Sequence, residues 1–356
     1  MKNTRKREYV TIDALRGVAA LVVVLFHSSA MLGTQYFPKG YLAVDLFFVL
    51  SGFVISHVYD SRLASGMTIK TFSWIRITRF YPLYLAGLVI GVVRELALQA
   101  TGSHFAMPGS EFLISAGFAL FLLPFPIPGL GGNLYNQNTP AWSLIYELIV
   151  NIAYAIALPF LTKRILAAIC LVTAVGLVVV GGNAGTLDGG ALVGDVGVAL
   201  LRTTFSFSLG ALVYRLKLTR IPIPSLLILA ATVVALMGVR GSSITYDLLF
   251  VFAVSPVLLI LAAGNEPSNS FMPIAVFLGM ASFPIYAIHR PLLLLAEAAG
   301  NLLHLPLSLF WAVTVAFILA STYPIVRWYD APFRRWLQRT TAIIPAVRQP
   351  SDTTHA

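Results

Sequence analysis

Long apolar runs separated by short polar connections make up most of the chain. Ten of these runs are 17 to 23 residues long. A helix needs about 20 residues to cross the hydrocarbon core of a bilayer, so the pattern predicts an all-α integral membrane protein with about ten transmembrane helices. The predicted spans are residues 12–31, 41–59, 80–98, 141–161, 164–181, 196–214, 223–239, 246–264, 274–296 and 307–326.

An eleventh apolar stretch, residues 112–123, is shorter and is followed by Pro124, Pro126 and Pro128. Short cytoplasmic loops are rich in lysine and arginine. Eighteen of the 24 basic residues fall in loops and ends that lie on one side only if this stretch does not cross. We therefore expect residues 99–140 to be external, with a re-entrant or interfacial apolar piece, and both termini to be cytoplasmic.

The composition supports this interpretation. Hydrophobic residues make up 58% of the 356 residues and charged residues 11%, whereas soluble domains carry about 25% charged residues. A soluble enzyme and a disordered protein are therefore excluded. We expect one membrane domain over residues 9–336, a short disordered cytoplasmic tail over residues 337–356, and a multi-pass location in a bacterial cytoplasmic membrane.

The net charge of +10 and the single cysteine restrict the possible partners. The basic residues sit in short loops without interleaved aromatic residues, which argues against nucleic-acid binding. Cys170 lies in an apolar run, so we expect no internal disulfide and no thiolate metal cluster. The sequence predicts no metal site, and it does not indicate an oligomeric state.

Two ionisable residues share one face of the first predicted helix. Arg16 and His27 are 11 positions apart, which at 100° per residue returns to within about 20° of the same face, roughly 16.5 Å further along the axis. Ionisable side chains inside a span cost about 2.5–3.5 kcal/mol on insertion scales and usually have a function. One stripe therefore carries a cation near the cytoplasmic end and an imidazole in the outer half.

Other polar residues fall at matching depths in their predicted spans. We expect the following side chains to surround one cavity on the external side: His27, Asp45, Glu147, Arg202 and His289. A structural interpretation stays open for some of them. Asp45 and Arg202 would then pair between two helices, and His289 would be a hydrogen-bonded packing residue.

Arg76 and Arg79 lie in a loop that is predicted to face the cytoplasm. They either bind the donor substrate of a reaction or are ordinary anchors that follow the positive-inside rule. Ser51, Trp142 and Tyr286 are further candidates for the cavity lining. Ser51 either bonds a reacting oxygen or packs a helix bend, and Trp142 either lines the cavity or marks the membrane interface.

These side chains suit a transfer reaction. A neutral imidazole in a cavity of low polarity removes a proton from a hydroxyl group. A carboxylate, Glu147 or Asp45, would orient the ring and stabilise the imidazolium. Two or three arginines on the cytoplasmic side suit a polyanion such as a nucleotide phosphate. The same residues also fit a transporter or flippase of a glycolipid, and the physical argument alone leaves both classes open.

Six short motifs resemble those of the membrane acyltransferase 3 family and occur in the family's order. They are IDALRG at 12–17 with His27 eleven positions after its arginine, DLFFVLSGF at 45–53, RITRFYP at 76–82, WSLIYE at 142–147, SFPIYAIHRP at 282–291 and YDAPFR at 329–334. Each motif alone is weak, whereas the ordered set covers nearly the whole chain and is specific. Asp330 departs from the pattern, because the family often has glutamate there.

The resemblance implies ten spans, no resident cofactor, and acyl-CoA, usually acetyl-CoA, as co-substrate. It implies that the acceptor is a hydroxyl group of a glycan, a lipid-linked saccharide or a similar molecule at the extracytoplasmic side. By the same resemblance His27 is the catalytic residue, Arg16 is its essential partner, and Arg76 and Arg79 handle the donor. We expect no fused SGNH esterase-like domain, so a second acyl-relay step would need another protein.

Overall fold

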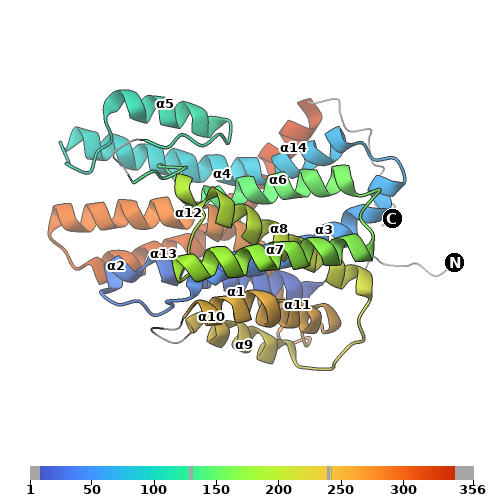
Figure 1. Cartoon of the computed structure of the whole chain (residues 1–356). Helices are drawn as coiled ribbons and strands as arrows, with labels where there is room; N and C mark the ends of the chain where they lie inside the picture. Colours follow the sequence, from blue (N-terminus) through green and yellow to red (C-terminus); the bar gives the residue numbers. More distant parts are fainter. Residues whose placement is uncertain (1–8, 128–130, 239–240, 242, 341–356) are drawn as a thin grey trace, which may run out of the picture.

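The computed structural model describes residues 9–127, 131–238, 241 and 243–340, which form helices and connections without a β-strand. The long helices lie side by side along one axis (Figure 1). The start of α1 (Val10–His27) and the whole of α14 (Ala331–Thr340) lie at the same end of this bundle, which we call the terminal end. The far end carries α2 (Ser29–Leu32) and the connection between α12 (Met272–Leu303) and α13 (Leu307–Pro324).

Eight segments are long and apolar enough to cross a membrane. They are α1, α3 (Ala43–Ala64) with the turn Gly40–Leu42 before it, α4 (Ile69–Ala100), α7 (Lys163–Ala184), α8 (Val196–Leu216) with the turn Val193–Asp195 before it, α10 (Ile244–Leu249) joined to α11 (Ser255–Gly264) by the π-helical turn Phe250–Val254, α12, and α13 joined to α14 by the π-helical turn Ile325–Asp330. These eight match predicted spans.

The two remaining predicted spans correspond to shorter helices. They are α6 (Ala141–Ala157) and α9 (Ser225–Met237), of 17 and 13 residues. The count of ten crossings and the cytoplasmic position of the termini therefore stay predictions. Helix α14 continues to Thr340, past the predicted start of the tail at residue 337, and the rest of that predicted tail lies outside the described residues.

The short helix α5 (Gly109–Leu120) lies beside α4, toward the far end of the bundle (Figure 1). Tyr84 and Tyr81 of α4 donate hydrogen bonds to the carbonyl oxygens of Ala119 and Leu120, at 2.6 and 3.0 Å. These carbonyl groups have no partner within α5 because they lie in its last turn. With 12 residues α5 is too short to span a bilayer, as expected for a re-entrant or interfacial piece.

Glycines allow the central helices to approach closely. A Cβ atom at Gly52 of α3 would lie 2.0 Å from the carbonyl oxygen of Phe207 in α8, and one at Gly17 of α1 would lie 2.3 Å from that of Leu278 in α12. Small residues at such positions let helix backbones pack in contact inside a membrane. The packing of α1 against α12 brings the two histidines of the candidate site onto facing helices.

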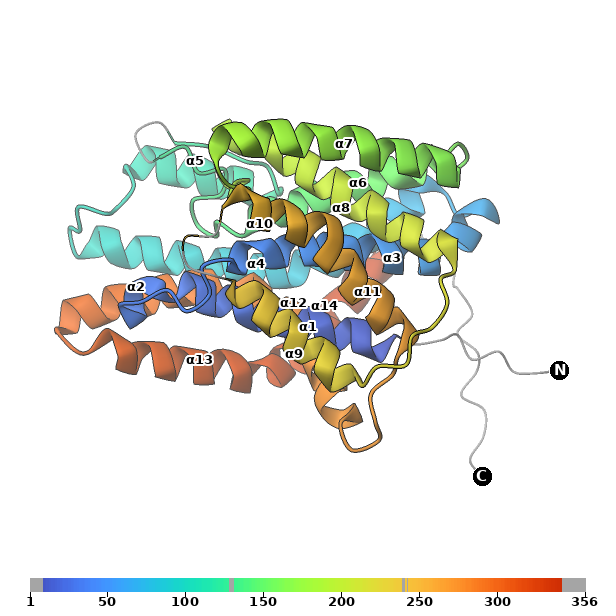
Figure 2. The same ribbon diagram turned by 60° about the horizontal axis from the view of Figure 1, so that its bottom comes forward.

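The helices differ in how much of their surface faces outward. In the most apolar stretch of α3, 78% of the residues are buried, against 11% for α13. Figure 2 shows α7 and α13 on opposite sides of the bundle, with α1 between them. Outward side chains such as Leu171 and Val313 are 67% and 61% exposed. Such an apolar surface is stable against lipid tails, so the chain is an integral membrane protein.

Candidate functional site

His27 is the last residue of α1 and lines a cavity of about 220 Å³ toward the far end of the bundle. Ser28 follows it and donates its hydroxyl to the carbonyl oxygen of Val24 at 2.6 Å, which closes the last turn. The wall of this cavity combines α1, the start of α3, the connections before α6 and α8, and α12. It includes His27, Tyr41, Trp142, Asp188, Arg202 and Tyr286. We call it the His27 cavity.

A second cavity, of about 30 Å³, contains Arg16 and Glu147. Tyr286 lines both cavities. Its hydroxyl forms a hydrogen bond of 2.6 Å with the hydroxyl of Ser143, which holds the ring in place between them. Arg16 and His27, which the sequence places on one face of α1, therefore lie on the two sides of Tyr286. We call the smaller space the Arg16 cavity.

Glu147 does not lie against His27, contrary to the prediction that it orients the imidazole. Its Oε1 accepts a hydrogen bond of 2.5 Å from the hydroxyl of Ser51 and one of 3.5 Å from Arg76. Glu147 is buried on α6, and its side chain turns toward the arginines. Ser51 accordingly bonds this carboxylate in the structure.

Asp45 is also bound elsewhere, so the prediction that it holds the His27 ring is wrong in geometry. The guanidinium of Arg202 donates to both carboxylate oxygens of Asp45, at 2.5 and 3.2 Å. Both side chains are essentially inaccessible, at 0% and 1% exposure. Arg202 also donates to the carbonyl oxygens of Gly189 (2.6 Å) and Tyr41 (3.2 Å), and it lies over the Trp142 ring at 5.8 Å. Asp45 and Arg202 thus form a structural pair that fixes the cavity wall.

The arginines gather on the terminal side of the Arg16 cavity. Arg76 is buried over the ring of Phe80, 4.9 Å from its centroid, whereas Arg79 is exposed. The charges that act on Arg79 include Arg16, Arg76 and Arg334. Glu147 and Asp330 pair with Arg76 and Arg334 and offset two of these four positive charges, so the cluster keeps an excess of positive charge. The cluster therefore suits a polyanionic ligand.

Arg334 was not predicted as a site residue. It lies on α14, which packs against α4, and it forms an ion pair with Asp330 one turn earlier. The sequence signal was present, because Arg334 ends the sixth motif, but the motif gave no position for the side chain. The packing of α14 against α4 brings its charge within electrostatic range of Arg79.

His289 of α12 is the side chain that faces His27. The two rings stack with centroids 5.3 Å apart and planes 28° apart. His289 is completely buried, and its Nδ1 lies 2.8 Å from the carbonyl oxygen of Tyr286. The neighbouring Arg290 donates to the backbone carbonyl oxygen of His27 at 3.5 Å. His27 and His289 thus lie against each other in the structure.

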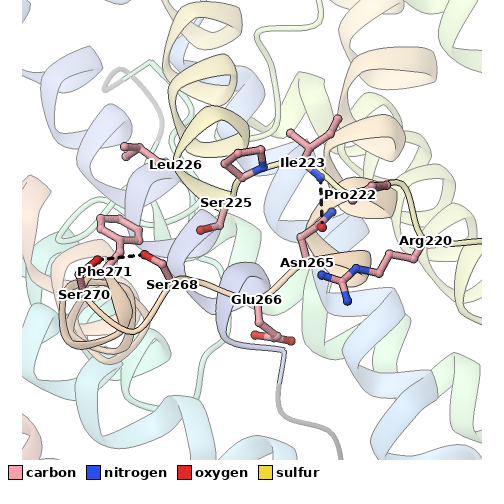
Figure 3. A pocket seen from close by; sticks show the side chains of 11 residues that line it. Arg220, Pro222, Ile223, Ser225, Leu226, Asn265, Glu266, Ser268, Ser270 and Phe271 are labelled. Carbon is pink, nitrogen blue, oxygen red and sulfur yellow. Dashed lines mark hydrogen bonds between the residues drawn. The ribbon is translucent and has the colours of Figure 1, made fainter.

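A cavity of about 570 Å³ lies at the terminal end, between the α8–α9 and α11–α12 connections (Figure 3). Arg220 and Glu266 supply its charged groups, and the side chain of Asn265 accepts a hydrogen bond from the backbone of Ile223 at 3.2 Å. Among the described residues, its wall contains none of those predicted for the site. It is therefore separate from the two cavities beside Tyr286.

Comparisons with known proteins agree with the motifs. A family model described as an acyltransferase domain matches residues 9–326. A protein of Rhizobium radiobacter named protein 2 in picA locus is 38% identical over 164 residues, which is 44% of this chain and 85% of that protein. The peptidoglycan O-acetyltransferase OatA of Listeria monocytogenes is 29% identical over 165 residues, 41% of this chain and 24% of that protein. The chain thus spans about a quarter of the Listeria protein. No solved structure matches.

The family match covers nearly the whole membrane bundle, including His27, Arg16, Arg76 and Arg79. The helices of that bundle are those of an integral membrane protein. The chain therefore belongs to the membrane acyltransferase 3 family and is a membrane-embedded acyltransferase.

Proposed function

We propose that the protein transfers an acetyl group from acetyl-CoA, bound at the terminal end, to a hydroxyl group of a glycan or lipid-linked saccharide at the far end. The observation that carries this proposal is the position of Tyr286 between two cavities. One cavity holds His27 and the other holds Arg16 next to the arginine cluster. The name of the Listeria relative, an O-acetyltransferase, supports the choice of acetyl group and oxygen acceptor.

The donor would bind through its phosphates. Coenzyme A carries a diphosphate and a 3′-phosphate, and guanidinium groups bind phosphate oxygens through paired, charge-assisted hydrogen bonds. Arg79 is exposed and Arg334 lies near it, so these two would meet the phosphates first. Arg16 and Arg76 lie deeper. The pantetheine arm would then extend past Tyr286 toward His27, roughly 16.5 Å beyond Arg16 along α1.

The chemistry at His27 would be general-base catalysis. A ring nitrogen of neutral His27 takes the proton of the acceptor hydroxyl, and the oxygen of that hydroxyl attacks the thioester carbonyl carbon. The tetrahedral intermediate collapses with cleavage of the carbon–sulfur bond. The imidazolium returns its proton to the leaving sulfur, which gives an O-acetyl ester and free CoA. No protein group is consumed in this sequence.

The orientation in the membrane would follow from charge. The start of α7, which carries Lys163 and Arg164, and the connection after α8, which contains Lys217, lie at the terminal end, together with α14. Basic connections stay in the cytoplasm, where acetyl-CoA is available. The far end, with the His27 cavity, would face the extracytoplasmic side of a bacterial cytoplasmic membrane, where the glycan is modified.

The test is acetyl transfer by purified protein in proteoliposomes. Acetyl-CoA with a saccharide acceptor should give CoA and an acetylated product detected by mass spectrometry. His27→Ala should lower turnover by about 10²–10⁴-fold, while His104→Ala, in an exposed connection of the far end, should not. A transporter without this chemistry would release no CoA. Near-normal transfer by a folded His27→Ala variant would refute the assignment.

A further inference from the structure

In the described part of the chain no carboxylate forms a hydrogen bond or ion pair with the His27 ring, although Asp188 and Asp195 line the same cavity. Asp45 is bound by Arg202, and Glu147 is bound by Ser51 and Arg76. A histidine that takes a proton needs a neighbouring acceptor, because one ring nitrogen binds the new proton and the other already carries an N–H. The cation nearest its backbone, Arg290, cannot supply that acceptor. The group whose ring lies against His27 is instead His289.

His289 offers an unused acceptor beside the His27 ring. Its Nδ1 lies 2.8 Å from the carbonyl oxygen of Tyr286 and 3.2 Å from that of Ile285. Carbonyl oxygens only accept hydrogen bonds, so Nδ1 carries the hydrogen and Nε2 carries a lone pair. Within the described residues this Nε2 is buried and has no hydrogen-bond partner. Buried polar atoms without a partner are rare and call for an explanation.

We propose that His289 is a positioning residue for His27, and that its Nε2 accepts the ring N–H of His27 while His27 holds the proton of the acceptor hydroxyl. The inference rests on the proposed function, because it assigns a partner to the same base. The hydroxyl O–H bond breaks, a new N–H bond forms on one nitrogen of His27, and the N–H on the other nitrogen donates to His289. His289 stays neutral throughout, and the proton later passes to the leaving sulfur.

The geometry permits this exchange with a turn of one side chain. The rings are stacked, at 5.3 Å between centroids, so the His27 ring must rotate before its N–H points at Nε2. His27 is the last residue of α1 and borders an open cavity, whereas His289 is fixed by its backbone hydrogen bonds in α12. The fixed ring therefore selects the orientation of the movable one, as the aspartate does in a nucleophilic triad.

Three substitutions separate this function from a packing function. In His289→Asn the side-chain amide keeps a donor near the position of Nδ1 and removes the acceptor at Nε2. His289→Phe keeps the stacked ring and removes both nitrogens. His289→Gln places an amide oxygen near the position of Nε2. We expect turnover in His289→Asn and His289→Phe to fall by about 10–100-fold, which is less than the loss caused by removing His27. The KM for acetyl-CoA should stay unchanged. His289→Gln should recover part of the turnover.

The matched control is His104→Asn, which makes the same change in an exposed connection and should leave turnover at the wild-type level. Size-exclusion chromatography shows whether the Asn and Phe variants are folded, and either folded variant is enough to test whether His289 positions His27. Wild-type turnover in a folded variant would overturn the inference. That result would leave the proposed function intact if His27→Ala is inactive, whereas an active His27→Ala would refute the proposed function itself.

Discussion

Replacing Arg202 with methionine should destabilise the protein more than replacing Asp45 with asparagine. The two side chains form an ion pair at 2.5 Å with 1% and 0% exposure. In the described structure, Asp45 has Arg202 as its partner, whereas Arg202 also donates to the carbonyl oxygens of Gly189 and Tyr41. Arg202→Met therefore leaves a buried carboxylate unpaired, while Asp45→Asn leaves the guanidinium with the carbonyl oxygens of Gly189 and Tyr41 and with the asparagine oxygen as acceptors.

The expected magnitude follows from the burial of both partners. Removing one partner of a buried ion pair costs about 3–5 kcal/mol, since the other charge stays in a medium that solvates it poorly. We expect Arg202→Met near the upper value and Asp45→Asn near the lower one. Each 1.36 kcal/mol is about a factor of ten, so even the lower value reduces the ratio of folded to unfolded protein more than about a hundredfold.

The assay is thermal unfolding of the purified variants in one detergent, together with CoA release at a temperature where each is folded. The double variant Asp45→Leu with Arg202→Met should be more stable than Arg202→Met alone, because no unpaired charge remains. Folded Asp45→Asn should keep most of its turnover. Normal stability of Asp45→Asn combined with a loss of turnover like that of His27→Ala would refute this account and restore a catalytic function for Asp45.

Further predictions concern the donor site and the orientation in the membrane. Arg334→Ala should raise the KM for acetyl-CoA several-fold, and more strongly at low salt, where charge interactions are less screened. Arg335→Ala removes the same charge one position further along α14 and should change this KM little; equal effects in steady-state kinetics would mean that only the net charge of α14 matters. After replacement of Cys170, a cysteine at His104 should react with an impermeant thiol reagent from outside intact cells, and one at Lys217 only after permeabilisation. Labelling of both from the same side would contradict the predicted orientation.

The sequence was sufficient for the features that depend on one segment at a time. Apolar runs of sufficient length predict spanning helices because the thickness of the bilayer sets that length, and eight of them are present. The distribution of basic residues predicts that the stretch containing α5 does not cross, and α5 has only 12 residues. The ordered motifs indicated the family, and the 11-residue spacing placed Arg16 and His27 on one face of α1.

The pairing of side chains was decided by the tertiary structure. Asp45 and Glu147 both fall at a suitable depth, but depth and periodicity do not say which helix a side chain will face. The close packing of α3 against α8 places Asp45 in an ion pair with Arg202. Glu147 is bound by Ser51 and Arg76. The packing of α1 against α12 instead brings His289 to His27. A buried charge takes the nearest complementary group because leaving it unpaired costs several kcal/mol, and only the arrangement of the helices determines which group is nearest.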